Sequence, residues 1–252
     1  MRRILVSSIV LAAASLSAQA QNVQVRVTIQ NLSPTNSLSF APLRVGFHNG
    51  TFDAFNNGQA ANAATISIAE GGSGADWFPA FMAAEPNATL GSIGGALTPG
   101  MTASSTFMVN PMMNRFFTFA SMVIPSNDHF IGNDNPMGFM LFTPGGELNI
   151  TSISQFGSSI WDAGSETQDP ANAAFLVGGV NAQRVAENGV VNFNFDRLDT
   201  FNGLTTAAGY TFNRQIAAST EVYRISFEIV PTPAAASALA LGGLLATRRR
   251  RV

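Results

Sequence analysis

Residues 23–30 alternate between apolar and polar side chains without a break. The aliphatic set runs from Val23 to Ile29, and the polar set runs from Gln24 to Gln30. Because successive side chains of a strand point to opposite faces, this period of two predicts a half-buried β-strand. Polar turn residues and Pro34 follow it, which indicates where the strand ends.

Other segments carry the same kind of signal. Alternation returns at 191–196 and 223–229, whereas 116–124 is apolar almost throughout, as expected of a strand buried on both faces. Shorter strand candidates lie at 43–47, 138–142 and 148–153, with a turn at 143–146 between the last two. A short helix is expected to begin at 76–79, and 91–104 is expected to be a long loop. About eight short strands without βαβ alternation predict an all-β fold, an antiparallel β-sandwich with short helices in its loops.

The first 20 residues have the pattern of a secretory signal peptide. Arg2 and Arg3 precede a short apolar run, and Ala18–Ala20 has the small-residue form of a cleavage site. The apolar run is too short for a bilayer span of about 20 residues, although an N-terminal anchor helix is the alternative. We therefore expect export and a mature domain over residues 21–230.

Residues 231–252 are expected to form a sorting tail. Proline residues at 231 and 233 precede the apolar run 234–246, and four arginines follow at 248–251. This order resembles the PEP-CTERM class of sorting signals. The resemblance implies cleavage by an exosortase-type membrane protease, only transient membrane contact, and delivery to the cell surface or extracellular matrix. A plain C-terminal anchor is the alternative.

Composition narrows the chemistry of the domain. The chain has no cysteine and only two histidines, so disulfides, thiol nucleophiles and multi-histidine zinc sites are excluded. Residues 21–230 contain all fifteen acidic residues but only seven of the thirteen arginines. An acidic body without a basic stripe is a poor binder of nucleic acid.

Two loops combine acids with glycine and asparagine, at 126–135 and at 161–169. If they meet at one end of the sandwich, their oxygens suit a calcium ion, which takes six to eight such ligands. The other interpretation is that Asp, Asn and Gly are simply turn residues. His129 lies in the first loop, and it is a ligand only if the metal is a different one.

The residues of these loops carry a resemblance to a known family. The run 120–132 (ASMVIPSNDHFIG) and the run 161–166 (WDAGSE) resemble two motifs of the spondin N-terminal domain, found in F-spondin and mindin. The stretches 42–49 and 68–72 also lie where that family has comparable residues. His129 replaces the family's usual tryptophan, and the cysteines of the animal domains are absent.

This resemblance implies an extracellular adhesion domain, a β-sandwich that binds calcium in loops at one end. Carried over residue by residue, it implies Asp128, Asp134, Asp162 and Glu166 as the metal ligands. The expected partner is a component of the extracellular matrix or cell surface, such as a polysaccharide.

Two other functions were weighed against this one. A carbohydrate-binding module would need an exposed aromatic platform, for which Trp77, Phe78, Phe81 and Trp161 are candidates, with core packing as the alternative. A secreted hydrolase could use an acid pair such as Asp76 and Glu85. No nucleophile elbow, phosphate-binding loop or histidine-based triad is present, so we expect no enzymatic activity.

Overall fold

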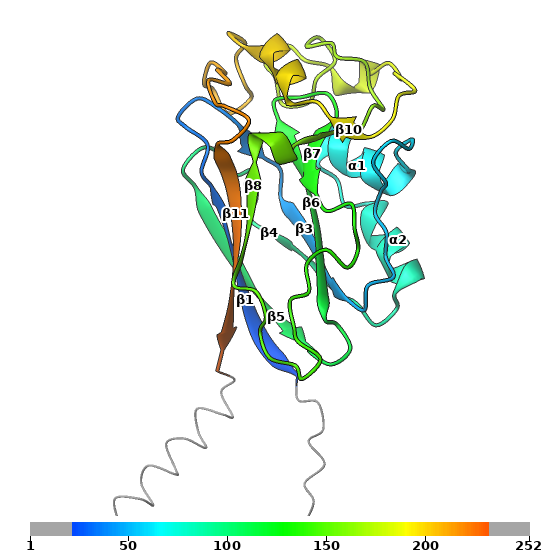
Figure 1. Ribbon diagram of the computed structural model, residues 1–252. Helices are drawn as coiled ribbons and strands as arrows, with labels where there is room; N and C mark the ends of the chain where they lie inside the picture. Colours follow the sequence, from blue (N-terminus) through cyan, green and yellow to red (C-terminus); the bar gives the residue numbers. More distant parts are fainter. Residues whose placement is uncertain (1–21, 232–252) are drawn as a thin grey trace, which may run out of the picture.

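The computed structural model describes residues 22–231, which form two packed antiparallel sheets (Figure 1). The expected signal peptide lies outside the described residues, and so does the expected sorting tail apart from Pro231. No helix within the described range has the length and apolarity needed to cross a membrane. The predicted all-β sandwich is confirmed.

The first sheet has four strands in the order β5-β1-β11-β8. Its strands are β1 Val23–Asn31, β5 Thr102–Val109, β8 Ser152–Phe156 and β11 Glu221–Val230. The alternation read from residues 23–30 faces the core as expected, since Val25, Val27 and Ile29 are fully buried. The first and last described strands pair from Gln24 opposite Val230 to Asn31 opposite Tyr223.

The second sheet follows the order β10-β9-β7-β6-β3-β4, with β2 paired to β6. Its strands are β2 Ser39–Phe40, β3 Leu43–His48, β4 Thr89–Ile93, β6 Phe116–Ile124, β7 His129–Gly132, β9 Trp161–Asp162 and β10 Asn192–Phe193. Aromatic rings join the two sheets. Phe117 of β6 meets Phe227 of β11 edge to face, with ring centroids 4.8 Å apart.

Strand β6 is buried along its entire length, as its apolar sequence predicted. One face lies on the core between the sheets, and helices α1 (Ala63–Gly71) and α2 (Trp77–Ala84) cover the outer face of the second sheet (Figure 1). A second aromatic cluster fills this layer, where Phe52 stacks on Phe81 at 3.9 Å between centroids. The central strands β6 and β7 of the second sheet are therefore buried on both faces.

Helix α1 has clear start and stop signals. The Asn62 side chain accepts a hydrogen bond from the Thr65 N–H at 2.9 Å, which satisfies one free donor of the first turn. Gly72 ends the helix in the left-handed region with φ +63°, and a Cβ there would lie 2.6 Å from the Ala41 Cβ. Glycine is required at this position for both reasons.

Several sequence predictions of local structure need correction. The segment 91–104 is not all loop, because β4 extends to Ile93 and β5 begins at Thr102. The turn at 143–146 is present, with the Gly146 N–H donating to the Thr143 carbonyl at 2.9 Å. Its flanks form only an isolated bridge between Phe142 and Leu148, and the strand begins later, at Ser152. The short helix near residue 76 is present as α2, whereas α1 was not predicted.

The alternation at 191–196 also formed less strand than expected. Only Asn192–Phe193 pairs as β10, and the chain then turns into a 3₁₀ helix, η3 (Phe195–Phe201). Two further 3₁₀ turns lie at η1 (Gly157–Ser159) and η2 (Asn181–Gln183).

Replacing Phe47 by alanine should strongly destabilise the fold. Phe47 is fully buried and its ring contacts both Phe107 and Phe117. Loss of a buried phenylalanine leaves a cavity and costs about 3–5 kcal/mol. Urea unfolding of the protein measures this loss. Met101→Ala is the control, because Met101 is 50% exposed; equal losses in the two variants would contradict the burial of Phe47.

Candidate metal centre

The register of the second sheet brings the two acidic loops together. Strand β7 runs antiparallel to β9 and places His129 directly opposite Asp162. Side chains at directly opposed positions lie on the same face of a sheet. Asp128 immediately precedes β7, and its carbonyl accepts a hydrogen bond from the Ala163 N–H at 3.1 Å.

Asp128 ties the first loop to the second through its carboxylate. Its Oδ2 atom accepts hydrogen bonds from the N–H groups of Ser165 at 2.8 Å and Glu166 at 3.0 Å. The hydroxyl of Ser165 adds a longer contact of 3.3 Å to the same oxygen. One carboxylate oxygen is therefore fully engaged, and it fixes the backbone of the facing loop.

The second loop depends on a glycine. Asp162 Oδ1 accepts a hydrogen bond from the Gly164 N–H at 2.8 Å, which closes a tight turn. Gly164 has φ +61°, and a Cβ there would lie 2.6 Å from backbone atoms of Val190. The turn thus requires an acceptor side chain at position 162 and a glycine at position 164, which explains these two residues of the run 162–166.

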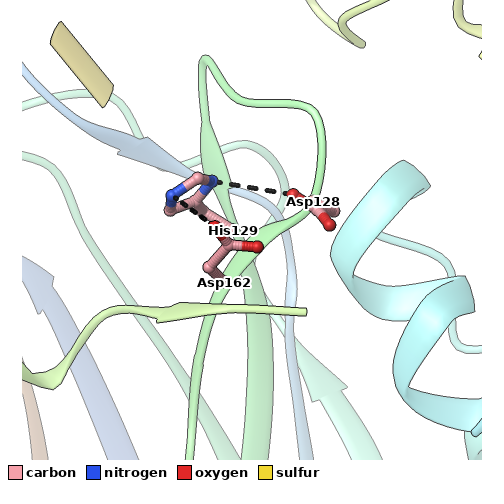
Figure 2. A group of neighbouring side chains, drawn as sticks. All are labelled: Asp128, His129 and Asp162. Carbon is pink, nitrogen blue, oxygen red and sulfur yellow. Dashed lines mark ion pairs between the residues drawn. The ribbon is translucent and has the colours of Figure 1, made fainter. Parts of the chain in front are cut away.

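The tautomer of His129 follows from its partner. Its Nε2 atom lies 3.1 Å from the backbone carbonyl of Asn194, which can only accept, so Nε2 carries the proton and donates. The Nδ1 atom therefore carries a lone pair. It faces Asp128 Oδ1 at 3.8 Å, and both atoms are buried without a hydrogen-bond partner (Figure 2).

Asp162 lies on the other side of the imidazole ring (Figure 2). Its Oδ2 is 3.9 Å from His129 Nε2 and accepts hydrogen bonds from Arg197 at 2.8 Å and the Asn194 side chain at 3.2 Å. Arg197 also forms an ion pair with Glu187 at 2.9 Å. Arg197 therefore compensates part of the negative charge at the centre.

Burial shapes the titration of the centre. Burial and then the charge of Asp162 raise the pKa of Asp128 to about 7, despite the opposing hydrogen bonds from Glu166 and Ser165. Burial lowers the pKa of His129, so its ring is neutral in the folded protein. A neutral imidazole with a free Nδ1 is the form that binds metals.

The structure brings together two of the four sequence-predicted ligands. Asp128 and Asp162 join His129 in one fully buried group, with one donor atom from each residue lying within 4.8 Å of the others. Within the described residues, this arrangement has the donors needed to hold one metal ion. Because all three side chains are enclosed, it fits a structural site better than an open catalytic one.

The other two predicted ligands lie outside this group. Glu166 contributes its backbone N–H to Asp128, while its carboxylate Oε1 accepts a hydrogen bond from the Asn127 side chain at 2.8 Å. Its Oε2 is buried without a hydrogen-bond partner, and burial raises the pKa of Glu166 to about 7. Asp134 follows β7 and is only half-buried.

Sequence reasoning missed the residues that support the centre. Asn194 belongs to the segment 191–196, which the alternation predicts as a strand, and Arg197 follows that segment within η3. His129 was considered a ligand only for a different metal. The run 129–132 (HFIG) carries no alternation that could have indicated this role, and only the register with β9 shows that His129 faces Asp162.

The chain was compared with known proteins. No protein-family model matches it, and no curated protein matches it.

Three of the four aromatic rings that are candidates for a carbohydrate-binding platform are buried, and Phe78 is half-buried. Trp77 and Phe81 are fully buried, and Trp161 is 6% exposed. The indole N–H of Trp161 donates to the Gly132 carbonyl at 3.0 Å inside the sheet. These rings are core residues, which was the alternative interpretation of the sequence.

A second buried polar cluster surrounds Glu85, one of the acids considered for hydrolysis. Glu85 accepts hydrogen bonds from the N–H groups of Asn49 at 2.7 Å and Phe52 at 2.8 Å, and also from Thr51. His48 lies 3.1 Å from the same carboxylate. Glu85 is 3% exposed and both its carboxylate oxygens accept hydrogen bonds, so its structural effect is to hold the loop 49–52.

This cluster should make the protein less stable in acid. Burial opposes ionisation of Glu85, but its backbone donors and His48 hold its pKa below the usual value. Burial lowers the pKa of His48. Because the carboxyl pKa is depressed, Glu85 contributes to the free energy of unfolding at neutral pH, and this contribution is lost as pH falls through the folded pKa. Because His48 is buried and neutral, the folded protein also becomes less stable as histidine in the unfolded chain takes up a proton near pH 6.5.

Glu85→Gln should therefore cost about 2 kcal/mol at pH 7, the usual scale for hydrogen bonds to a charged group. The difference from the wild type should narrow as pH falls below 4.5 and through the lower folded pKa of Glu85, where the wild-type carboxylate also loses its charge. Chemical unfolding from neutral pH down to strongly acidic pH measures both effects. Glu147→Gln is the control, since Glu147 is exposed; a constant difference across this range would contradict the assignment.

Proposed function

We propose that this chain is an exported surface protein whose β-sandwich is stabilised by one divalent cation at the centre formed by Asp128, His129 and Asp162. The observation that carries the proposal is the pair of buried lone pairs on Asp128 Oδ1 and His129 Nδ1, 3.8 Å apart and without hydrogen-bond partners. Buried polar atoms are almost always paired. A cation between them supplies the missing partner and offsets the charges of the two acids.

The layout of the domain supports display on a surface. The described chain begins at β1 and ends at β11 on one end of the sandwich, whereas β7 and β10 lie at the opposite end (Figure 1). A tail attached after β11 would hold the first end near the membrane. The loops that carry the metal centre would then point outward, toward a matrix or surface component such as a polysaccharide.

An adhesive role fits these features together with the resemblance to the spondin N-terminal domain. Calcium is the cation that this resemblance implies, and loops at one end of a sandwich are where that family binds it. The expected acidic ligands Asp128 and Asp162 are neighbours, as a shared ion requires.

Adding a divalent cation to the metal-stripped mature protein should raise its melting temperature. A ligand at 100 times its Kd stabilises the native state by about 2.7 kcal/mol, which corresponds to several degrees for a domain of this size. Asp128→Asn should abolish the rise, because the isosteric amide removes a charged donor. Thermal unfolding with and without Ca²⁺, Mn²⁺ or Zn²⁺ measures it.

Asp134→Asn is the matched control, because Asp134 lies outside the three-residue group. Its melting temperature should respond to the cation as the wild type does. A wild-type protein that no divalent cation stabilises would refute the proposal.

Deleting residues 231–252 should release the domain from the cell. If the tail delivers the protein to the surface, the truncated protein appears in the medium, while the full chain stays accessible to antibody on intact cells. Fractionation and immunoblotting compare the two. Retention of the truncated protein inside the cell would argue against a sorting role for the tail.

A further inference from the structure

The metal centre has a donor that calcium rarely uses. His129 offers the lone pair of Nδ1, because its Nε2–H donates to the Asn194 carbonyl at 3.1 Å. Hard cations such as calcium prefer oxygen, whereas imidazole nitrogen suits zinc and neighbouring transition metals. The identity of one donor atom therefore bears on which ion the proposed site takes.

The oxygen supply at the centre is also small. Of the four carboxylate oxygens of Asp128 and Asp162, three already accept hydrogen bonds from backbone or side-chain donors. Asp128 Oδ1 is the one without a hydrogen-bond partner. Calcium takes six to eight oxygen ligands, whereas zinc takes four ligands in all, of which three can come from the protein and one from water.

The surroundings of His129 match those of metal-bound histidines. In such sites the second ring nitrogen usually donates to a carbonyl or carboxylate, which fixes the tautomer and the ring orientation. Asn194 supplies that carbonyl here. The two acids are held in the same way, Asp128 by the N–H groups of Ser165 and Glu166, and Asp162 by Arg197.

The distances are consistent with a small ion after slight contraction. Asp128 Oδ1 and His129 Nδ1 are 3.8 Å apart, and one potential ligand atom from each of the three residues lies within 4.8 Å of the others. Ligand atoms around tetrahedral zinc are separated by about 3.4 Å, given metal–ligand bonds near 2.0–2.1 Å. The donors would need to move inward by a fraction of an ångström up to about 1 Å.

We propose that the centre formed by Asp128, His129 and Asp162 selects a zinc-class transition-metal ion over calcium and holds it as an enclosed structural ion. This inference rests on the proposed cation site and names the metal that occupies it. The ion would join the start of β7 to β9 and, through Asn194 and Arg197, to η3.

The test uses the untagged mature protein, labelled with ¹⁵N at histidine. The chain has only two histidines, so the spectrum contains one ring from the centre and one internal reference, His48. Zinc should shift the Nδ1 resonance of His129 and leave the Nε2–H tautomer and the His48 signals unchanged. Calcium should leave both rings unchanged.

Calorimetry of the metal-stripped protein gives the selectivity. Zinc should bind at least about 100-fold more tightly than calcium, since calcium sites of extracellular modules have Kd values of roughly 10⁻⁴–10⁻³ M. His129→Gln should weaken zinc binding by at least about 100-fold, because losing even an outer-shell partner costs roughly 10–100-fold. Asp134→Asn should bind zinc as the wild type does.

The outcomes separate this inference from the proposed function. Calcium binding equal to or tighter than zinc binding, or zinc binding that leaves the His129 resonances unmoved, overturns the metal preference but leaves a cation site. Absence of binding by any divalent cation overturns both. The labelled wild-type protein gives this answer even if His129→Gln fails to fold.

Discussion

The pairing of β7 with β9 is the constraint on which the candidate centre depends. It sets His129 opposite Asp162 on one face of the sheet and brings Asp128 against the turn after β9. In a structure with a period of two, a shift of one residue in this register would turn His129 away from Asp162. The hydrogen bonds from Ser165 and Glu166 to Asp128 hold the two segments in place.

Burial makes the charges of this arrangement energetically costly. The three side chains of the centre have no exposed surface, and the loop after β9 and the segment at η3 contact them through Ser165, Asn194 and Arg197. Ionised groups in such surroundings are unfavourable unless charges and donors compensate them. Arg197 compensates Asp162, backbone N–H groups compensate Asp128 Oδ2, and the facing lone pairs of Asp128 Oδ1 and His129 Nδ1 are what a cation would complete.

The buried cluster around Glu85 differs from the candidate centre in its hydrogen bonding. There each carboxylate oxygen accepts backbone hydrogen bonds, and both nitrogens of His48 have partners, Glu85 and Thr118. That network is complete without a ligand and fixes a loop beside β3. At the candidate metal centre, by contrast, Asp128 Oδ1 and His129 Nδ1 are buried without hydrogen-bond partners.

The sequence alone determined the all-β class. Within β1 and β11 the two-residue period records which side chains are buried, and the apolar run of β6 records burial on both faces. The sequence also determined which loops hold the acids. Only the tertiary structure decided that Asp128 and Asp162 meet while Asp134 does not, that Trp77 and Phe81 belong to the core, and that His129 points into the centre. These facts depend on strand register and on contacts between residues far apart in the chain, such as Asn194 with His129, and no local pattern records them.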